Sequence, residues 1–208
     1  MEKQQQSPSA VRGQGMLEWY EALISAALVL VLIFSFFFRI IQVDGRSMVP
    51  TLTHGDKLIV WAAGYTPQRG DVVIVDGTEA HLFSDPEQTQ VVEKKGIGIN
   101  LIKRVIAVAG DQLDIDFTAG TVTLNGVVQK EDYINMLTTR NDGAFTYPLT
   151  VPEGYIFVMG DNRNASTDSR STLVGLVPED AVIGHAVYRF ARDEKLRSTW
   201  AEQFSVID

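Results

Sequence analysis

A serine at position 47 stands in the stretch VDGRSMVPTL, directly after a long apolar run. Gly45 permits a close backbone approach two residues before it, and Pro50 restricts the chain three residues after it. These neighbours favour a hydroxyl that is held in one position, which a serine nucleophile requires. The position of Ser47 alone suits a polar turn residue equally well, so a catalytic role for Ser47 depends on finding a base.

Histidine is the usual base for a catalytic serine, and the chain has three candidates for a Ser-His-Asp triad: His54, His81 and His185. None of them stands in a triad motif. The residues around Ser47 do not form the G-x-S-x-G turn of the α/β-hydrolases, and no serine is followed by lysine at the third position, as penicillin-binding enzymes require.

A neutral lysine is the alternative base, and Lys103 is the best candidate. It lies in INLIKRVIAV, the most apolar setting of any lysine after the apolar run. Burial can lower the ordinary lysine pKa of about 10.4 by up to 3–5 units, which would leave the amine uncharged. Strand alternation puts Lys103 on one face with Leu101 and Val105, and Arg104 on the other. A lysine that extends from a strand end to solvent is the competing interpretation.

A third stretch, MGDNRNASTDSR, follows the apolar run YIFV and is dense in side chains that form local hydrogen bonds. Asp161 and Asp168 are suited to pair with Arg104 and Arg170, and Ser166 to hydrogen-bond with a lysine amine. A solvated loop explains the composition equally well, so both interpretations stay open.

One segment is predicted to cross a membrane. From Ala22 to Phe38 the chain carries no charge, which at 1.5 Å per residue covers about 26 Å of a hydrocarbon core of about 30 Å. We expect an anchor over residues 16–42 after a disordered tail over residues 1–15. The basic residues on the two flanks do not decide its orientation.

Composition excludes several classes of protein. The chain has 208 residues, a net charge of −8 and no cysteine. An acidic chain lacks the basic face of a general nucleic-acid binder. Without cysteine, thiolate catalysis, cysteine zinc sites and disulfides are excluded. We expect no cofactor and no metal.

After the anchor the sequence predicts a mainly β fold with antiparallel sheets. Short β-rich runs alternate with turn signals, among them Asn125-Gly126, a strong two-residue hairpin signal. We expect a β-rich domain over residues 43–190 that contains a small β insert over residues 112–150. Residues 81–96 are predicted to form a surface loop or irregular hairpin, and residues 191–208 a tail that forms a short helix or frays.

These motifs resemble the bacterial type I signal peptidases, membrane-anchored proteases that cut leader peptides from exported proteins. The resemblance covers the anchor and nearly all of residues 43–190. Four motifs occur in order, followed by Gly175: SMVPTL from Ser47, RGDVVIV from Arg69, LIKRVIAVAGD from Leu101 and GDNRNASTDSR from Gly160.

The resemblance implies a role for each of these residues. Ser47 would be the nucleophile and Lys103 the general base, on strands that converge. Ser166 would orient the lysine amine, Arg104 would pair with Asp161, and Arg170 with Asp168. The backbone N–H of Ser47 would be one oxyanion donor.

Two positions depart from the family pattern. Some members carry, at the position of Gly45, a serine whose hydroxyl is the second oxyanion donor, although single-span members commonly have glycine there. The stretch AVAGD lacks the usual proline before its glycine, which affects a turn. The size of the insert places this chain nearer the single-span branch.

The resemblance also implies the substrates and the location. The partners would be exported preproteins with signal peptides and the lipid bilayer, and cleavage would follow small-x-small residues. The preprotein would lie as an extended strand beside IQVDG and INLIK. The N-terminus would lie in the cytoplasm and the catalytic domain outside.

A second question concerns the apolar residues near Ser47, namely Met48, Val49, Leu52 and Trp61. They fit two arrangements: insertion into the outer lipid leaflet beside the substrate, or packing into the β core. The sequence does not decide between them.

Two rival functions are carried forward. Self-cleaving repressors also use a serine-lysine dyad with a similar SMxP run, but they resemble soluble DNA-binding chains, and no helix-turn-helix pattern precedes Ser47 here. The other rival is a membrane-tethered β domain that binds export partners and whose dyad is idle.

Overall fold

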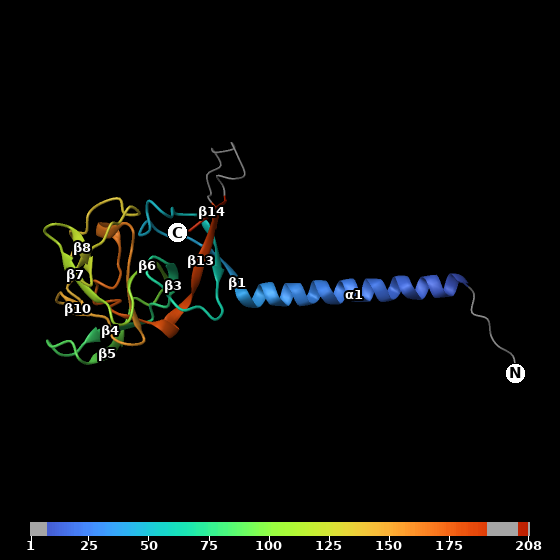
Figure 1. The fold of residues 1–208 in the computed structure, drawn as a ribbon, viewed down its shortest axis with the longest axis horizontal. Helices are drawn as coiled ribbons and strands as arrows, with labels where there is room; N and C mark the ends of the chain where they lie inside the picture. The colour runs from blue at the N-terminus through green and yellow to red at the C-terminus, as the bar shows by residue number, and fades with distance from the viewer. Residues whose placement is uncertain (1–7, 191–203, 208) are drawn as a thin grey trace. The chain divides into compact units, whose positions relative to one another are not determined.

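The structure is a computed structural model that describes residues 8–190 and 204–207 of the chain. The chain divides into two compact units, Met1–Phe38 and Arg39–Asp208. The first contains the helix α1 (Pro8–Phe37), and the second contains almost all of the strands (Figure 1).

Helix α1 is long and apolar enough to cross a membrane. Its Glu18–Phe37 part has 20 residues, a mean hydropathy of 2.2 and no residue buried inside the protein. The helix begins at Pro8 and therefore takes up part of the segment that we expected to be a disordered tail; residues 1–7 lie outside the described residues. It ends at Phe37, before the expected end of the anchor at residue 42, because the chain continues as a strand from Phe38.

The strands of the second unit form three antiparallel sheets, as the sequence predicts. The main sheet has eight strands in the order β1-β2-β13-β3-β6-β11-β12, with β14 paired to β13. Their bounds are β1 (Phe38–Gln42), β2 (Lys57–Trp61), β3 (Val72–Val75), β6 (Leu101–Ala107), β11 (Tyr155–Met159), β12 (Val177–Pro178), β13 (Val182–Phe190) and β14 (Phe204–Val206).

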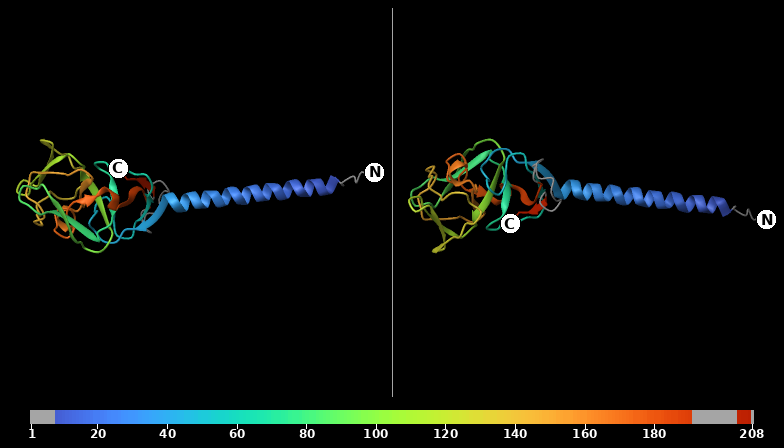
Figure 2. Two further views of the ribbon diagram at one scale, coloured as in Figure 1. Left: turned by 90° about the horizontal axis from the view of Figure 1, so that it is seen from below. Right: turned by 90° about the horizontal axis from the view of Figure 1, so that it is seen from above.

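The other two sheets are smaller. One has the order β10-β7-β8-β9 and lies within the expected insert over residues 112–150. It lies beside β6, on the side away from β13 (Figures 1 and 2). The other is the hairpin β4-β5. The remaining bounds are β4 (Glu79–Phe83), β5 (Val91–Lys95), β7 (Gln112–Asp116), β8 (Thr121–Leu124), β9 (Val127–Val128), β10 (Leu149–Thr150), and the short 3₁₀ helices η1 (Arg163–Ala165) and η2 (Glu179–Ala181).

The hairpin between β8 and β9 confirms the turn predicted from Asn125-Gly126. Leu124 pairs with Val127, and the two residues between them have φ values of +51° and +80°. Asparagine and glycine tolerate this left-handed conformation, which the tight turn requires at both central positions.

Residues 81–96 belong to a regular hairpin, the more ordered of the two forms that the sequence left open. Strands β4 and β5 pair over five positions, from Glu79 with Lys95 to Phe83 with Val91. His81 and Leu82 are buried, so the hairpin is not a freely solvated loop.

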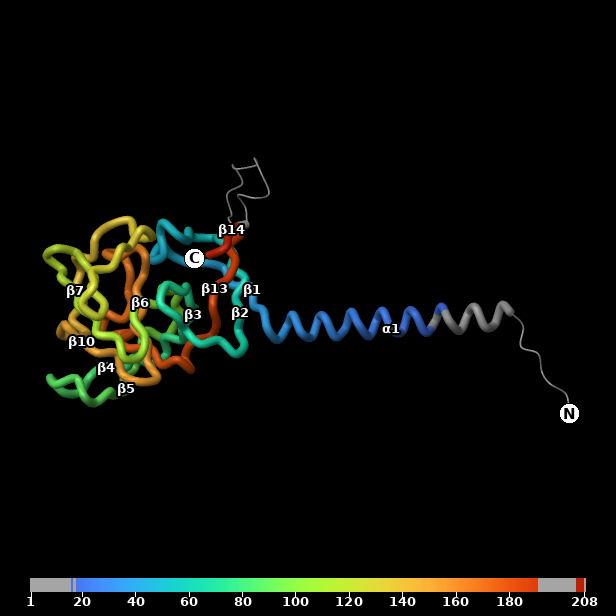
Figure 3. The backbone as a smooth tube through the Cα atoms, in the orientation of Figure 1, coloured from blue at the N-terminus to red at the C-terminus, as the bar shows by residue number. Residues whose placement is uncertain are grey.

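The long strand β13 pairs with three neighbours. Its first half pairs with β3, its second half pairs with β2, and its last residues pair also with β14 (Figure 3). Strand β14 corrects part of the expectation for residues 191–208, because 204–206 form a strand rather than a helix or a frayed end. Residues 191–203 and 208 lie outside the described residues.

Alternation along the strands explains how the insert attaches to the main sheet. In β7, QLDID, the leucine and the isoleucine are buried and the other three residues are exposed. The buried faces of β7 and β8 pack on β6 and β11 in one hydrophobic cluster, which includes Ile106, Phe157 and Met159. The insert is therefore fixed to the strand that carries Lys103.

The chain around Ser47 packs into a second hydrophobic cluster, and this answers the question left open for its apolar neighbours. Met48 is 1% exposed and Leu52 is 0% exposed, and both lie among β2 and β3 side chains. Val49 and Trp61 are half-buried. Met48 and Leu52 therefore belong to the core and do not form a lipid-dipping surface. Burial of each side chain contributes about 1.5–3 kcal/mol.

Truncation of this core should destabilise the domain. We expect Leu52→Ala, in the full chain in detergent micelles, to lower the free energy of unfolding by about 2–5 kcal/mol, because it leaves a cavity under the Ser47 turn. Val127→Ala, at a residue that is 64% exposed, is the control and should change it by less than about 0.5 kcal/mol. Equal losses in denaturant melts of the two variants would contradict the assignment of Leu52 to the core.

Candidate active site

Ser47 lies in a turn after β1, whereas the family resemblance implied that it lies on a strand. Backbone hydrogen bonds hold the turn at both ends. Val43 N–H donates to Asp56 O at 2.8 Å, and Gly55 N–H donates to Val43 O at 2.9 Å. Within the turn, Leu52 N–H donates to Met48 O at 2.9 Å. Met48 and Leu52 are buried beneath it. The hydroxyl of Ser47 is thus held by backbone bonds and core packing, as its neighbours in the sequence indicated.

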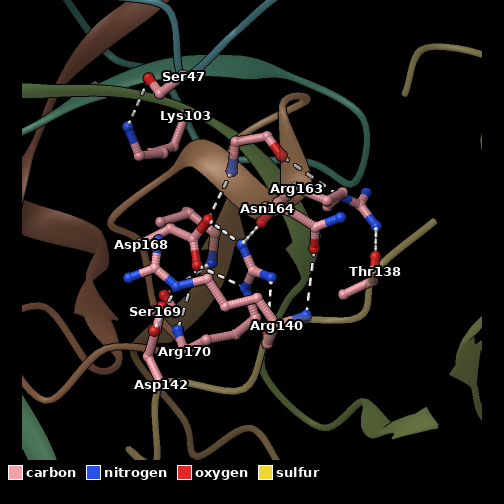
Figure 4. A network of polar contacts seen from close by, with 12 residues as sticks. Ser47, Lys103, Thr138, Arg140, Asp142, Arg163, Asn164, Asp168, Ser169 and Arg170 are labelled. Carbon is pink, nitrogen blue, oxygen red and sulfur yellow. Dashed lines mark hydrogen bonds and ion pairs between the residues drawn. The ribbon is translucent and has the colours of Figure 1, made fainter. Parts of the chain in front are cut away.

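Lys103 is on β6, and its amine lies within hydrogen-bond distance of Ser47. Lys103 Nζ is 3.1 Å from Ser47 Oγ and 2.9 Å from Ile102 O, to which it donates. Lys103 is only 2% exposed, so it does not extend to solvent from a strand end. Figure 4 shows the two side chains pointing toward each other. A lysine amine at this distance can take the serine proton if it is neutral.

Burial lowers the pKa of Lys103 from 10.5 to about 8, because the ammonium loses its hydration. The negative charges of Asp168 and Asp161 oppose this shift, and the positive charge of Arg170 supports it. Since the pKa lies well below the ordinary value, the neutral amine becomes the main form as the pH rises above about 8.

Asp161 and Arg104 form a buried ion pair next to Lys103. Arg104 Nε and Nη2 each donate to a different oxygen of Asp161 at 2.9 Å, and the two residues are 0–1% exposed. Asp161 also accepts from Thr51 Oγ1 at 2.5 Å, and Arg104 Nη1 donates to Gly70 O at 2.6 Å. The pair thereby ties the strand of Lys103 to the turn that carries Ser47.

A second buried ion pair, Asp168 with Arg170, shapes the loop of residues 160–170, which we call the 160–170 loop. Arg170 Nε and Nη2 donate to the two oxygens of Asp168 at 2.8 Å, and both side chains are 0% exposed. Burial alone would raise the pKa of Asp168, but Arg170, the Gly160 N–H and Ser166 outweigh it and hold the pKa below its usual value. Asp168 therefore stays ionised.

Ser166 is buried close to these groups, but its contact with the lysine amine is not formed. Its Oγ has no hydrogen-bond partner within normal limits, although it lies near enough to Asp168 to help lower the pKa of that carboxyl. Among the described residues, Lys103 Nζ hydrogen-bonds only to Ser47 and Ile102. The expected orienting role of Ser166 stays a prediction.

Gly160 explains how the 160–170 loop approaches Ser47 so closely. A Cβ at this position would lie 2.5 Å from Ser47 O and 2.6 Å from Ser166 Cβ. Real Cβ atoms essentially never come that close, so only glycine fits here. The loop then bonds to the turn through Asn162, whose N–H donates to Ser47 O at 2.9 Å and whose Nδ2 donates to Arg46 O at 3.1 Å.

Gly45 has a backbone conformation that favours glycine. Its φ is +101°, and its N–H donates to His54 Nδ1 at 3.3 Å. There is free space where a side chain would project, but a serine there would be strained by the positive φ. Position 45 therefore supplies no side-chain hydrogen-bond donor next to Ser47.

The three histidines do not form a triad with Ser47. His54 bonds to Gly45 and lies 3.2 Å from Asp44, His81 belongs to the β4-β5 hairpin, and His185 stacks on Tyr65. No hydrogen bond between a histidine and Ser47 is present in the described part of the chain.

One group of side chains outside this site has the composition of a metal site. Glu79, His81 and Glu93 bring one potential ligand atom each to within 4.8 Å of one another on the β4-β5 hairpin. Both glutamates are exposed, and Lys95 pairs directly opposite Glu79. Cross-strand charge pairing accounts for this arrangement without an ion.

A pocket of about 230 Å³ opens beside Ser47 and Lys103. Its walls come from the end of β1, the chain that follows it and the beginning of β6, and apolar side chains such as Ile41, Val43 and Ile102 line it. These are the two segments, IQVDG and INLIK, beside which the sequence predicts an extended substrate.

Several residues that build the site were not assigned from the sequence. Thr51 and Asn162 connect the Ser47 turn to the 160–170 loop, and Asn164 binds the insert by accepting from the N–H groups of Thr139 and Arg140 at 3.1 Å (Figure 4). Arg163 is 0% exposed although it is an arginine in a loop. For Asn162, Arg163 and Asn164 the only signal was the polar density of the loop, and for Thr51 it was its place in SMVPTL.

Comparison with known proteins identifies close relatives. A model of the family described as "Signal peptidase, peptidase S26" matches residues 16–191. The "Probable signal peptidase I-1" of Synechocystis sp. is 39% identical over 81% of this chain and 79% of its own length. The "Signal peptidase I" of Bacillus licheniformis is 32% identical over 92% of this chain and 97% of its own. A crystal structure of a signal peptidase I from Enterococcus faecalis is 29% identical and matches 58% of this chain and 97% of that one, with a TM-score of 0.42.

Breaking the buried ion pair should be far more costly than breaking an exposed one. We expect Asp161→Asn to lower the free energy of unfolding by about 3–5 kcal/mol, because it removes the carboxylate that accepts two hydrogen bonds from the buried Arg104 guanidinium. The matched control is Asp132→Asn, which breaks the exposed pair with Lys130 and should cost less than about 1 kcal/mol. If denaturant melts gave the two variants similar losses, Asp161 would not have the structural role assigned to it.

Proposed function

The chain belongs to the signal peptidase family, peptidase S26, and is a serine endopeptidase, and we propose that it removes signal peptides from exported preproteins by a Ser47–Lys103 dyad. The observation that carries the mechanism is the 3.1 Å approach of Lys103 Nζ to Ser47 Oγ, with the amine 2% exposed. Membership of this family argues against the alternative function, that of a self-cleaving repressor.

In the proposed first half of the reaction, neutral Lys103 Nζ takes the proton of Ser47 Oγ as the oxygen bonds to the scissile carbonyl carbon. The negative charge that develops on the carbonyl oxygen is stabilised by the N–H of Ser47. Lys103 then gives its proton to the leaving amine, the C–N bond breaks, and an ester links Ser47 to the signal peptide.

In the second half, Lys103 is neutral again and takes a proton from water. The resulting hydroxide attacks the ester carbonyl, and the C–O bond to Ser47 breaks. Lys103 returns the proton to Ser47 Oγ, which regenerates the enzyme. The bond from Nζ to Ile102 O supports this scheme, because it helps to hold the amine within reach of the hydroxyl.

The proposed cleavage specificity is for small-x-small sites. The pocket of about 230 Å³ beside Ser47 supports it, since apolar walls close to the nucleophile leave room for small side chains. The preprotein would bind as an added strand between the segment after β1 and the start of β6.

We further propose that α1 anchors the enzyme in the cell membrane, with the N-terminus in the cytoplasm and the catalytic domain outside. The 20-residue apolar part of α1, Glu18–Phe37, supports an anchor, because at 1.5 Å per residue it spans about 30 Å. Trp19 and Tyr20 at its beginning suit a membrane interface. The orientation follows from family resemblance alone.

Removal of either dyad member should abolish cleavage. We expect Ser47→Ala and Lys103→Met, each in the full chain in detergent, to release signal peptide from a preprotein with a small-x-small site at less than about 1/1,000 of the wild-type rate, measured by the mass of the fragment. The matched control Lys94→Met removes an exposed lysine and should cleave normally.

The same proteins distinguish an active dyad from an idle one. A serine-reactive acylating inhibitor should label the wild type and Lys94→Met but not Ser47→Ala. Cleavage by correctly folded Ser47→Ala or Lys103→Met would disprove the dyad, and failure of the wild type to react would favour the binding domain with an idle site.

A further inference from the structure

A tyrosine of the insert, Tyr133, lies against two buried arginines of the active-site region. The centroid of its ring is 4.2 Å from Arg104 Cζ and 5.8 Å from Arg163 Cζ. Guanidinium groups at these distances are attracted to the face of an aromatic ring. Arg104 is the residue next to Lys103 on β6, and Arg163 is in the 160–170 loop.

The ring of Tyr133 is held in place by a network of its own. Its hydroxyl donates to Glu131 Oε1 at 3.0 Å, and both oxygens of Glu131 accept from Arg163, at 2.8 and 2.6 Å. Burial and the charge of Glu131 raise the pKa of Tyr133, so the phenol stays protonated and keeps donating. Tyr133 therefore cannot turn away from Arg104 without breaking its hydrogen bond to Glu131.

Arg163 carries the connection to the 160–170 loop. Its Nη1 donates to Thr138 Oγ1 at 2.8 Å, and its Nε donates to Gly160 O at 3.2 Å (Figure 4). Gly160 is the residue that packs against the carbonyl of Ser47. The network thus begins in the insert and ends at the backbone of the proposed nucleophile.

Arg104 carries the connection to the base. Its guanidinium has one face toward Tyr133 and two N–H groups on Asp161, a carboxylate whose charge acts on Lys103. If the ring were lost, water would reach Arg104 and weaken its two hydrogen bonds to Asp161. A less neutralised Asp161 would stabilise the ammonium form of Lys103, which does not react.

We propose that Tyr133 is a positioning residue for the peptidase reaction, holding the Arg104–Asp161 pair in place next to Ser47 and Lys103. This inference rests on the proposed dyad and extends it to the insert. Tyr133 does not touch the reacting atoms; it acts through Arg104, and the insert becomes a part of the active site rather than a separate β region.

The test compares three variants of the full chain in detergent, with preprotein cleavage followed from pH 6 to pH 10. Tyr133→Leu removes the ring, and Tyr133→Phe keeps the ring but removes the hydroxyl. Tyr155→Leu is the matched control, because Tyr155 is also half-buried but its ring packs on His81 at 5.6 Å between centroids. Thermal melts of all three give their stabilities.

Tyr133→Leu should lower kcat by about 10–100-fold with KM changed by less than about threefold, because the reacting groups are displaced and the substrate pocket is not. Its pH midpoint should move above the wild-type value of about 8. Tyr133→Phe should stay within about fivefold of the wild type with the same midpoint. Tyr155→Leu should keep kcat and midpoint even where its melting temperature falls.

Two results would overturn the proposal: Tyr133→Leu with unchanged kcat and midpoint, or a loss of kcat that Tyr155→Leu reproduces at equal destabilisation. If Tyr133→Leu does not fold, Tyr133→Met replaces it, since it also removes the ring from Arg104 and keeps an apolar side chain there, and its midpoint must also rise. Inhibitor labelling separates this test from that of the dyad. A wild type that is labelled at Ser47 and cleaves, together with an inactive Lys103→Met, establishes the dyad whatever Tyr133 does. A wild type that is neither labelled nor active contradicts both the dyad and the role of Tyr133.

Discussion

The proposed mechanism depends on a lowered pKa for one lysine amine although two carboxylates lie near it. Burial lowers the pKa of Lys103 to about 8, but Asp168 and Asp161 work in the opposite direction. The shift survives because burial outweighs the two carboxylates and the positive charge of Arg170 supports it. Each carboxylate also accepts two hydrogen bonds from its own arginine, Arg170 for Asp168 and Arg104 for Asp161. Without these arginines the carboxylates would favour the ammonium, and a protonated lysine accepts no proton from serine.

The same two ion pairs also fix the distances between chain segments. The Arg104–Asp161 pair joins β6 to the 160–170 loop and, through Thr51, to the turn of Ser47. The Asp168–Arg170 pair shapes the loop so that Gly160 meets the carbonyl of Ser47 at a distance that only glycine permits. Buried charges are costly to assemble, and here they are fully paired and link three segments that are far apart in the sequence.

How far the sequence could predict this structure differs between its parts. Strands with apolar alternation or a strong turn signal, such as those around Asn125-Gly126, were predicted because local rules determine them. The boundary of the anchor was misplaced, because the apolar run continues through Ile40 and Ile41 although they belong to strand β1. Ordered motifs brought Ser47, Lys103 and the two ion pairs together as candidates, and the structure places these side chains in contact; their catalytic roles are proposals.

The contacts that the sequence did not reveal are those between distant segments. Nothing near Tyr133 in the sequence indicates that its ring meets Arg104, because that contact arises only when the insert packs on β6. For the same reason the sequence did not decide whether Met48 and Leu52 contact lipid or the protein core. An apolar side chain fits either environment until its neighbours are placed. Ser166 matched a motif, yet its hydroxyl forms no hydrogen bond with the lysine amine, because a motif gives the type of residue and not its contacts.

The most direct measurement is the titration of Lys103 itself, by NMR of the full chain in detergent with lysine labelled with ¹³C at the ε carbon. The Lys103 signal is the one that Lys103→Met lacks. It should titrate with a midpoint of about 8, well below the value of about 10.4 for lysine in model peptides. A Lys103 signal that titrates near 10.4 would show an amine whose pKa burial does not lower, and would contradict the account.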